Sequence, residues 1–299
     1  MKRKKRGLIH LFLRTFEEFG NDKVFKLSAA LAYYTVFSLP SMLIIIISIT
    51  GFIFGKQAAE GQVYTHLNSL VGSSIAQQIE AVIKNAHLAG NSVTGTVIGI
   101  VTLLVGATGI FSEMQDSLNI IWGIRTPNRK SWLAVLINRG LAFIMVLGMG
   151  FVLIFSLILN ALLSSFGSRL SEYFPNLSVY FLLMANYALI FLIIVVLIAV
   201  IYKVLPDAKI SYRDVFIGAL ITALLFMIGK FGIGVYLEHS HFSNAYGAAS
   251  SIILLLLWVY YSSVSLYLGA EFTQVFAHQY GGKIRPKEYA VLVKKEEIV

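Results

Sequence analysis

The sequence predicts an all-α integral membrane protein: a six-transmembrane-helix bundle with an N-terminal interfacial helix and an amphipathic extracytoplasmic helical loop. Two observations predict this class. The 299 residues are 57% hydrophobic and only 13% charged, about half the charge of a typical soluble domain, which leaves too few polar side chains to cover a water-facing surface. Several long windows also lack charged residues almost entirely, and each would cross a hydrocarbon core of roughly 30 Å as a helix.

The apolar windows are expected to be helices, because hydrocarbon cannot satisfy free backbone groups and the windows lack the alternating pattern of barrel strands. A membrane domain is therefore predicted over residues 27–277, between a basic amphipathic segment at 1–26 and a basic cytoplasmic tail at 278–299. The expected spans are residues 28–54, 93–114, 136–166, 177–202, 213–237 and 246–276.

Two amphipathic segments accompany the spans. After the basic run at the N-terminus, apolar residues recur at helical spacing: Leu8, Ile9, Phe12, Leu13, Phe16 and Phe19. This pattern is typical of a helix that lies in the interface plane, and the basic run also suits a plain topogenic signal. The long outside loop at 56–92 repeats apolar residues at three- and four-residue steps, so one or two helices are expected there, lying on the outer membrane face or capping the bundle.

The distribution of Lys and Arg predicts the orientation. These residues gather in 1–26, around the second and fourth junctions and after residue 278, whereas the alternate loops hold only Lys56, Lys84 and Arg169. Positive charge is retained on the cytoplasmic side, so both termini are expected in the cytoplasm. Anionic lipid of the inner leaflet is then the partner that accounts for the net charge of +9, and no nucleic-acid partner is expected.

The motifs of soluble enzymes are missing from the sequence. There is no cysteine, and hence no thiolate metal site and no cysteine nucleophile. There is also no nucleophile elbow, no HExxH and no paired acidic motif, and the segment from Gly51 to Lys56 lacks Walker spacing. We therefore expect no enzyme activity, no cofactor and no resident metal. An intramembrane enzyme built on Glu238, His239 and His241 is the least favoured alternative.

A charge network is predicted at the cytoplasmic side of the bundle. Polar groups inside a membrane are costly and usually face the bundle interior or a water-filled cavity. Arg139 lies a few residues into the third span. Glu113, Asp116 and Glu271 lie in the same layer, near the cytoplasmic ends of the second and sixth spans. We expect Arg139 to face one or more of these acids; the alternative is a ring of interfacial charges that reach water separately.

A second polar group is predicted in the outer half of the bundle. Lys230 lies about 10 Å inside the fifth span, and Asn160 and Asn186 fall at a similar depth. Gly229 and Gly232 beside the lysine permit close approach of a backbone or a ligand. A cation with nearby amides suits an anionic headgroup or solute, so these residues are a candidate outer-side cargo site. The alternative is a lysine that snorkels towards the interface.

Aromatic and small residues carry weaker signals. Trp122 flanks a cytoplasmic junction and is interpreted as an interface anchor. Trp258 and Tyr260 lie near mid-membrane, where they either line a cavity or pack in the core. Pro40 interrupts the first span and is expected to kink it. Small-residue pairs such as Gly95–Gly99 would serve contacts within one protomer or between the protomers of a homo-oligomer.

Several blocks of the sequence resemble the YihY/BrkB family of bacterial inner-membrane proteins. They run in family order over nearly the whole chain: ALAYYTVFSLP at 30–40, MQDSLNIIW at 114–122, Arg139-Gly140, YKVLPD at 202–207, Gly229-Lys230, Tyr246-Gly247, Trp258-Val-Tyr260 and Gly269-Ala-Glu271.

The resemblance implies a six-helix inner-membrane protein whose activity is poorly defined. One branch of the family bears a virulence label, and another was once labelled a ribonuclease, which the residues of this chain do not support. Family members are discussed as transporters or envelope lipid-handling proteins. The function expected is therefore movement or handling of an anionic or amphipathic cargo, with a non-transporting envelope-integrity scaffold as the alternative.

Overall fold

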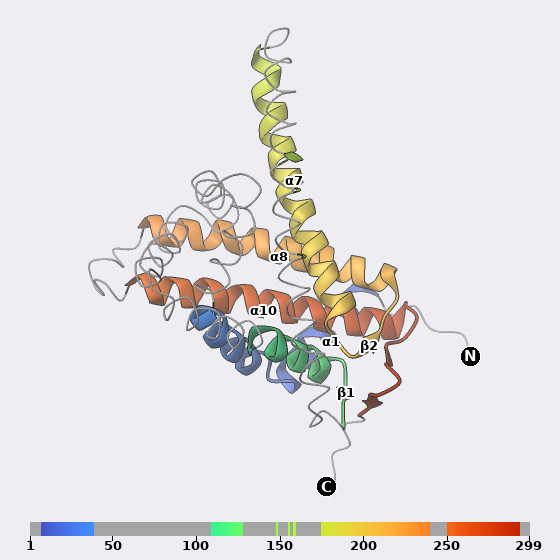
Figure 1. Cartoon of the computed structure of the whole chain (residues 1–299). Coiled ribbons are helices and arrows are strands. Elements are labelled where there is room, and N and C mark those ends of the chain that lie inside the picture. Colours follow the sequence, from blue (N-terminus) through green and yellow to red (C-terminus); the bar gives the residue numbers. More distant parts are fainter. Residues whose placement is uncertain are drawn as a thin grey trace, which may run out of the picture.

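The computed structural model describes residues 7–38, 109–127, 148, 155, 158–159, 175–239 and 250–293. The labelled helices are α1 (Leu8–Asn21), α7 (Pro175–Val204), α8 (Tyr212–His239) and α10 (Ser250–Gln279), as Figure 1 shows. Residues 109–121 and Val24–Ser38 are also helical. The short strands are β1 (Ile124–Arg125), β2 (Ala208–Lys209), β3 (Arg285–Pro286) and β4 (Val291–Leu292).

Three described helices are long and apolar enough to cross a membrane: Met184–Val204, Tyr212–Ile233 and Ile253–Gln279. They coincide with the fourth, fifth and sixth expected spans, so the chain is a helical membrane protein. The apolar helix Val24–Ser38 begins where the first span is expected. Most of the second span, nearly all of the third, the 56–92 loop and Pro40 lie outside the described residues, so the count of six spans stays a prediction.

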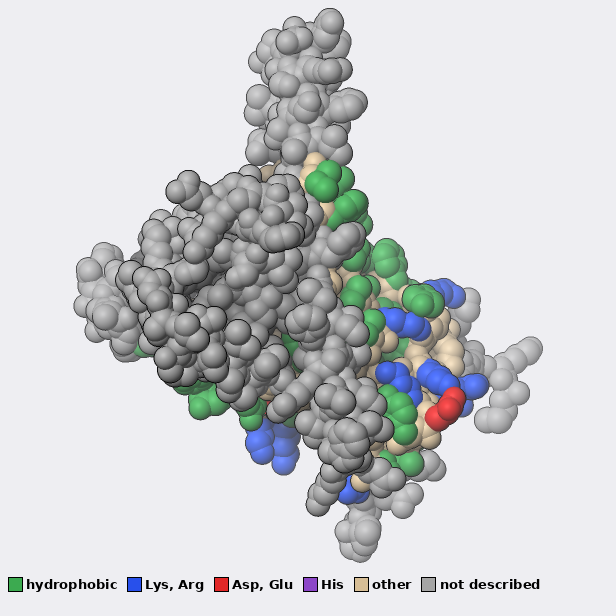
Figure 2. Space-filling view, in the orientation of Figure 1, with side chains coloured by type: hydrophobic (Ala, Val, Ile, Leu, Met, Phe, Trp, Pro, Cys, Tyr) green, Lys and Arg blue, Asp and Glu red, His purple; other side chains and the backbone are tan. Residues whose placement is uncertain are grey.

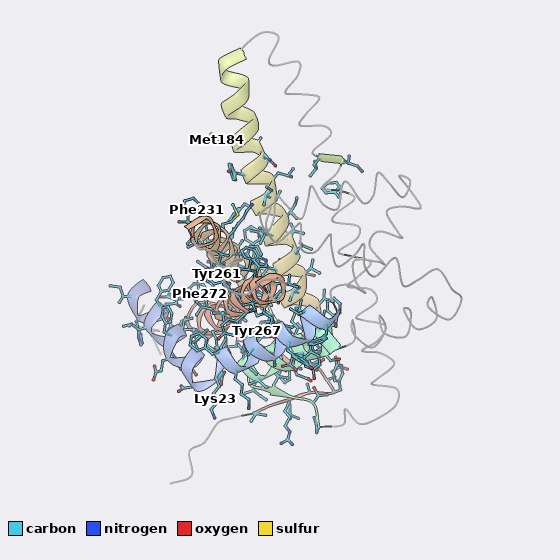
Figure 3. The ribbon with its side chains drawn as sticks, turned by 90° about the vertical axis from the view of Figure 1, so that its left-hand side faces the viewer. Lys23, Met184, Phe231, Tyr261, Tyr267 and Phe272 are labelled. Atoms are coloured by element: carbon cyan, nitrogen blue, oxygen red, sulfur yellow. The ribbon has the colours of Figure 1, made fainter. Side chains whose placement is uncertain are left out.

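The spanning helices carry apolar side chains on their outer surface. Met184 of α7 is 74% exposed and Phe231 of α8 is 76% exposed, whereas Tyr267 of α10 is buried inside the helix group (Figure 3). Hydrophobic side chains lie along the coloured, C-terminal part of α7 in Figure 2, and Lys and Arg side chains gather near the C-terminal end of the helix. An outer surface of this kind suits contact with lipid tails, because water would penalise so much exposed apolar area.

A tight connection joins α7 to α8. Pro206 cannot continue a helix, and α7 ends at Val204, two residues before it. Lys203 in the last turn of α7 donates a hydrogen bond to the Ile210 carbonyl and lies 4.0 Å from the centre of the Tyr212 ring. A cation in this position also meets the negative end of the helix dipole. The connection therefore turns the chain sharply, and α8 crosses α7 at a steep angle near their connected ends (Figure 1).

Close glycine contacts hold α8 against α10. A methyl group on Gly229 would lie 1.7 Å from the Tyr261 ring, and one on Gly269 would lie 1.7 Å from the Thr222 hydroxyl oxygen. Neither position has room for a side chain. The two helices approach as closely as small-residue interfaces allow, which is the way membrane helices gain packing contacts without a hydrophobic driving force.

The N-terminal helix α1 packs on α10. Leu11, Thr15 and Phe19 are buried and recur every four residues, so they form one face of the helix. Leu11 joins a cluster with Phe272 and Val275 of α10. The expected amphipathic helix therefore forms. Ile9, Leu13 and Phe16 are 60–78% exposed, and the predicted location in a membrane interface stays a prediction.

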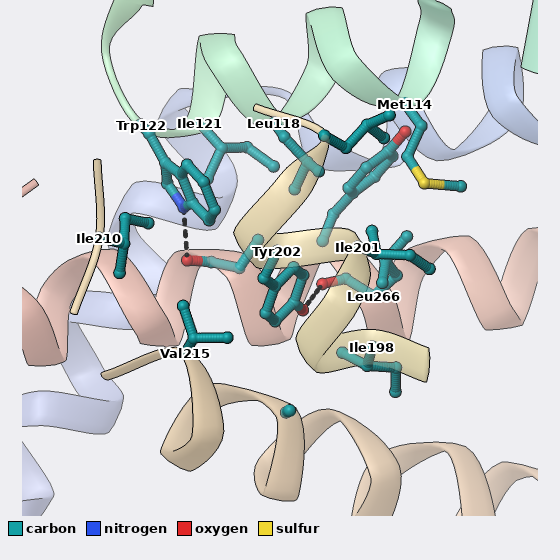
Figure 4. Close-up of a cluster of buried hydrophobic side chains, with 14 of the residues drawn as sticks. Met114, Leu118, Ile121, Trp122, Ile198, Ile201, Tyr202, Ile210, Val215 and Leu266 are labelled. Atoms are coloured by element: carbon teal, nitrogen blue, oxygen red, sulfur yellow. Dashed lines mark hydrogen bonds between the residues drawn. The ribbon is translucent and has the colours of Figure 1, made fainter. Parts of the chain in front are cut away.

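The buried core lies where the 109–121 helix, α7, α8 and α10 meet. Trp122 and Tyr202 pack edge to face there with ring centres 6.1 Å apart (Figure 4). The Trp122 Nε1–H donates to the Ala270 carbonyl at 3.1 Å, and the residue is only 1% exposed. The interpretation of Trp122 as an interface anchor is therefore wrong. The indole lies near a junction because it contacts α10, and its N–H is hydrogen-bonded inside the protein.

Candidate functional site

The most highly connected polar group in the described part of the chain is Asp207, in the turn between α7 and α8. Its Oδ1 accepts hydrogen bonds from Gln115 Nε2 at 3.0 Å and the Tyr289 hydroxyl at 3.1 Å. Its Oδ2 accepts from Asn119 Nδ2 at 2.9 Å and the Thr126 hydroxyl at 3.0 Å. The residue is 3% exposed, so the four donors, all neutral, take the place of water around a buried carboxylate.

Three separate parts of the chain position these donors. Gln115 and Asn119 lie four residues apart on the 109–121 helix and so share one face. Asn119 also accepts the Asp207 backbone N–H at 2.9 Å. Thr126 follows a turn at Gly123, where φ of +65° favours glycine. Tyr289 comes from the C-terminal tail.

The C-terminal tail is held against the other two segments by backbone pairing. Strand β3 pairs antiparallel with β2, and β4 pairs antiparallel with β1. The Lys287 N–H donates to the Asp207 carbonyl at 2.9 Å, and the Val293 N–H donates to the Gly123 carbonyl at 2.7 Å. We call the group of Asp207, Gln115, Asn119, Thr126 and Tyr289 the Asp207 cluster. It locks one end of the bundle, and a carboxylate so fully engaged by donors is an anchor rather than an available base.

A second polar layer lies deeper along α10. The Tyr202 hydroxyl donates to the Leu266 carbonyl and lies 2.9 Å from the Thr222 hydroxyl. Tyr267 and Glu271, one turn apart on α10, are both 0% exposed. Neither the Tyr267 hydroxyl nor either Glu271 oxygen has a hydrogen-bond partner of normal geometry among the described residues. Buried polar groups are nearly always paired, so this pair of residues requires an explanation.

The acids of the predicted charge network occupy different environments. Glu271 is fully buried, and Asp116 is exposed. Glu113 is half-buried and accepts a hydrogen bond from the Ser117 hydroxyl at 3.4 Å. Arg139 lies outside the described residues. The network with Arg139 therefore stays a prediction.

The residues of the predicted outer-side site differ from one another in burial. Lys230 is half-buried on α8, next to the contact of Gly229 with Tyr261. Asn186 is exposed on α7, and Asn160 lies outside the described residues. The cargo site formed by these three residues stays a prediction.

The two mid-span aromatic residues of α10 differ in burial. Trp258 is 4% exposed and packs edge-on against Phe226, with ring centres 5.4 Å apart. Tyr260 is half-buried.

The Asp207 cluster was not anticipated from the sequence. Its members come from residues 115 to 289, and apart from Gln115 and Asn119 no local spacing connects them. The one available signal is that two blocks carrying the family resemblance, 114–122 and 202–207, supply the carboxylate and two of its donors. A third block, 269–271, supplies the carbonyl that Trp122 binds. The resemblance therefore marks residues that meet in space.

Comparison with known proteins places the chain in a family. The sequence model of the family described as "Virulence factor BrkB" matches residues 15–291. The chain belongs to the BrkB family. It is 28% identical to a UPF0761 membrane protein of Aeromonas salmonicida over 270 residues, which cover 88% of each chain. It is also 28% identical to a UPF0761 membrane protein of Alteromonas mediterranea over 272 residues, 90% of this chain and 87% of that one.

These relationships confirm the resemblance to the BrkB family and the assignment to membrane proteins. No solved structure matches the chain. The names of the relatives state a membrane protein and no activity, so the function has to be argued from the residues.

Proposed function

We propose that this BrkB-family protein transports or handles an anionic or amphipathic cargo in the bacterial inner membrane, and that Lys230 meets the anionic group of the cargo. The observation that carries the proposal is a lysine inside the candidate span Tyr212–Ile233. A charged side chain in a span is costly and is usually retained where it serves a pathway or a binding site.

The surroundings of Lys230 suit an amphipathic ligand. Ile228 and Phe231 on either side of it are 66% and 76% exposed, so this stretch of α8 presents an apolar surface. The adjacent Gly229 packs on Tyr261 of α10. A lipid lying along α8 would place its acyl chains on the exposed apolar residues and its headgroup near the ammonium. Asn186 and Asn160 are the proposed amide donors for that headgroup.

At the other end of the bundle, Arg139 with Glu113 and Asp116 would form a cytoplasmic gate. Arg139 is the natural partner of these two acids, because a guanidinium binds carboxylates through two parallel hydrogen bonds. The exposure of Asp116 and the half-burial of Glu113 are compatible with a pair that opens and closes at a water boundary.

Mass spectrometry of the molecules that co-purify with the protein in native lipid discs tests the proposal. We expect one anionic lipid or solute to be enriched with the unchanged protein and lost with Lys230→Ala. Lys209→Ala is the matched control, because the Lys209 side chain is 62% exposed on β2. Equal bulk lipid in all three samples would contradict the proposal and leave Lys230 as a snorkelling residue.

The second candidate function is a non-transporting envelope scaffold, and the Asp207 cluster favours it. That cluster satisfies its polar groups within the chain and fixes the fold without exposing a reactive group. In this case the 56–92 loop would dock a partner. Deleting the loop would then abolish envelope integrity, while Lys230→Ala and Asn186→Ala would leave it unchanged; the opposite pattern favours transport.

A further inference from the structure

Glu271 is a buried acid that the proposed function does not use. It lies on α10 within the candidate span Ile253–Gln279, eight residues before the end of the helix, or about 12 Å along the axis at a rise of roughly 1.5 Å per residue. Its exposure is 0%, and neither carboxylate oxygen has a hydrogen-bond partner among the described residues.

A comparison with Asp207 shows why the lack of hydrogen-bond partners at Glu271 is unusual. Both carboxyl groups are buried, but Asp207 receives four side-chain donors at 2.9–3.1 Å, whereas Glu271 receives none from the described residues. A buried carboxylate without donors loses its hydration and gains nothing in return, so the charged form is strongly disfavoured. A bound proton removes that cost without any further ligand.

Among the described residues, no cationic side chain on the elements packed around Glu271 donates a hydrogen bond to it. On α1, which packs on α10, Glu18 carries a negative charge and Arg14 pairs with it at 3.8 Å. On the 109–121 helix, Glu113 is held by Ser117. On α8, Asp214 accepts the Gly282 N–H.

The titratable groups of α10 near Glu271 are Tyr267, a phenol one turn away, and His278, an exposed residue whose ring bonds the Gln274 carbonyl. Among the described residues of these elements, no cationic side chain donates a hydrogen bond to Glu271. A bound proton would supply the missing partner.

We propose that Glu271 is a proton-binding site at the interface of α1 with α10, and that loss of the proton loosens α1. The site adjoins the cluster of Leu11, Phe272 and Val275 that holds α1 in place. Ionised Glu271 would draw water into this interface and would repel Glu18. The inference does not depend on the cargo proposed above, and it leaves Glu113 and Asp116 as the partners of Arg139.

Infrared spectroscopy of the protein in lipid discs tests directly whether the Glu271 carboxyl group carries a proton. We expect a protonated carboxylic C=O band at neutral pH that Glu271→Gln abolishes and Glu288→Gln retains, because the Glu288 side chain is 93% exposed. Glutamine has the shape of neutral glutamic acid, so this variant is expected to fold. Absence of the band, or its persistence in Glu271→Gln, would overturn the proposal and require a cation such as Arg139 beside an ionised Glu271.

A spin label on α1 tests whether loss of the Glu271 proton loosens this helix. The chain has no cysteine, so Leu13→Cys gives a single labelling site on the 63% exposed position of α1. Label mobility should rise as pH increases, because Glu271 then releases its proton, and Glu271→Gln should abolish the rise. An identical pH response in Glu271→Gln and the unchanged chain would contradict the coupling.

A second variant keeps this test decisive if Glu271→Gln folds poorly. Glu18→Gln removes the like charge that favours proton binding, so the mobility transition should move to lower pH. Glu17→Gln is the matched control, because Glu17 is the exposed neighbour on the same helix. Equal transitions in both variants would overturn the role assigned to Glu18.

Discussion

The indole N–H of Trp122 donates a hydrogen bond to the backbone carbonyl of Ala270 at 3.1 Å, and so joins two segments 148 residues apart. The bond fixes the end of the 109–121 helix on α10. It lies in the same core as the Tyr202 ring. Removing it therefore tests how much this junction contributes to the fold.

Trp122→Ala should lower the free energy of unfolding by about 3–5 kcal/mol, because it leaves a cavity in the core. Trp122→Phe keeps most of the buried area, loses the hydrogen bond and leaves the Ala270 carbonyl unsatisfied, so a loss of about 1–3 kcal/mol is expected. Thermal unfolding in detergent measures both. Ile120→Ala, at a position 45% exposed on the same helix, is the control; an equal loss there would show that the junction is not special.

Asp207→Asn should destabilise the protein strongly. The amide would turn one acceptor oxygen into a donor that faces the existing donors, and hydrogen bonds to a charged group contribute about 1.5–3 kcal/mol each. We expect a lower melting temperature and faster proteolysis of the tail beyond Gly282. Glu288→Gln removes an exposed pair with Lys209 at 3.5 Å and should change stability by less than about 1 kcal/mol. Similar melting temperatures for both variants would count against the cluster as an anchor.

Gln115→Ala and Tyr289→Phe should not be additive. Both side chains donate to the same oxygen of Asp207, from segments far apart in the sequence. Residues that share one hydrogen-bond network show coupling free energies of about 0.5–3 kcal/mol in a double-mutant cycle. Unfolding of the two single variants and the double variant gives this coupling. Strict additivity would mean that the tail does not act through Asp207.

The membrane spans were predictable because hydropathy is a local property. The expected span 177–202 lies within α7, and the expected spans 213–237 and 246–276 differ from α8 and α10 by one to four residues at each end. The helical periodicity of α1 was also visible, but the face that packs on α10 contains Leu11 and Thr15, which were not among the apolar residues that predicted the helix. These patterns need only the periodicity of one helix.

The polar contacts were not predictable in the same way. Asp207 meets donors from three other segments, and only the folded chain brings Tyr289 beside Gln115. Trp122 was misread because an indole near a junction has the same sequence pattern in a lipid interface and in a buried hydrogen bond. Glu271 was identified as a polar residue of the span, but its full burial follows from α10 packing on α1 and its other neighbours.

Arg139 should couple energetically to Glu113 or Asp116 if the proposed gate exists. A double-mutant cycle of Arg139→Gln with Glu113→Gln, and another with Asp116→Asn, measures the coupling in thermal unfolding. A charge pair at a partly exposed site should give about 0.2–1 kcal/mol. Arg125→Gln, which removes an exposed arginine of β1, is the matched control. No coupling in either cycle would exclude the gate.

Gly229→Ala should disturb both the fold and the proposed cargo contact, whereas Gly232→Ala should disturb neither. A methyl group at Gly229 would overlap the Tyr261 ring at 1.7 Å, while a methyl group at Gly232 meets nothing within 4 Å. Overpacking of this kind costs about 1–3 kcal/mol. Gly232→Ala should instead gain about 0.5–1 kcal/mol, because glycine is unfavourable in a helix interior. Thermal unfolding measures the effect on stability, and the amount of co-purified lipid measures the effect on the proposed cargo contact. If the two variants behave alike, the close approach of α8 to α10 does not position Lys230.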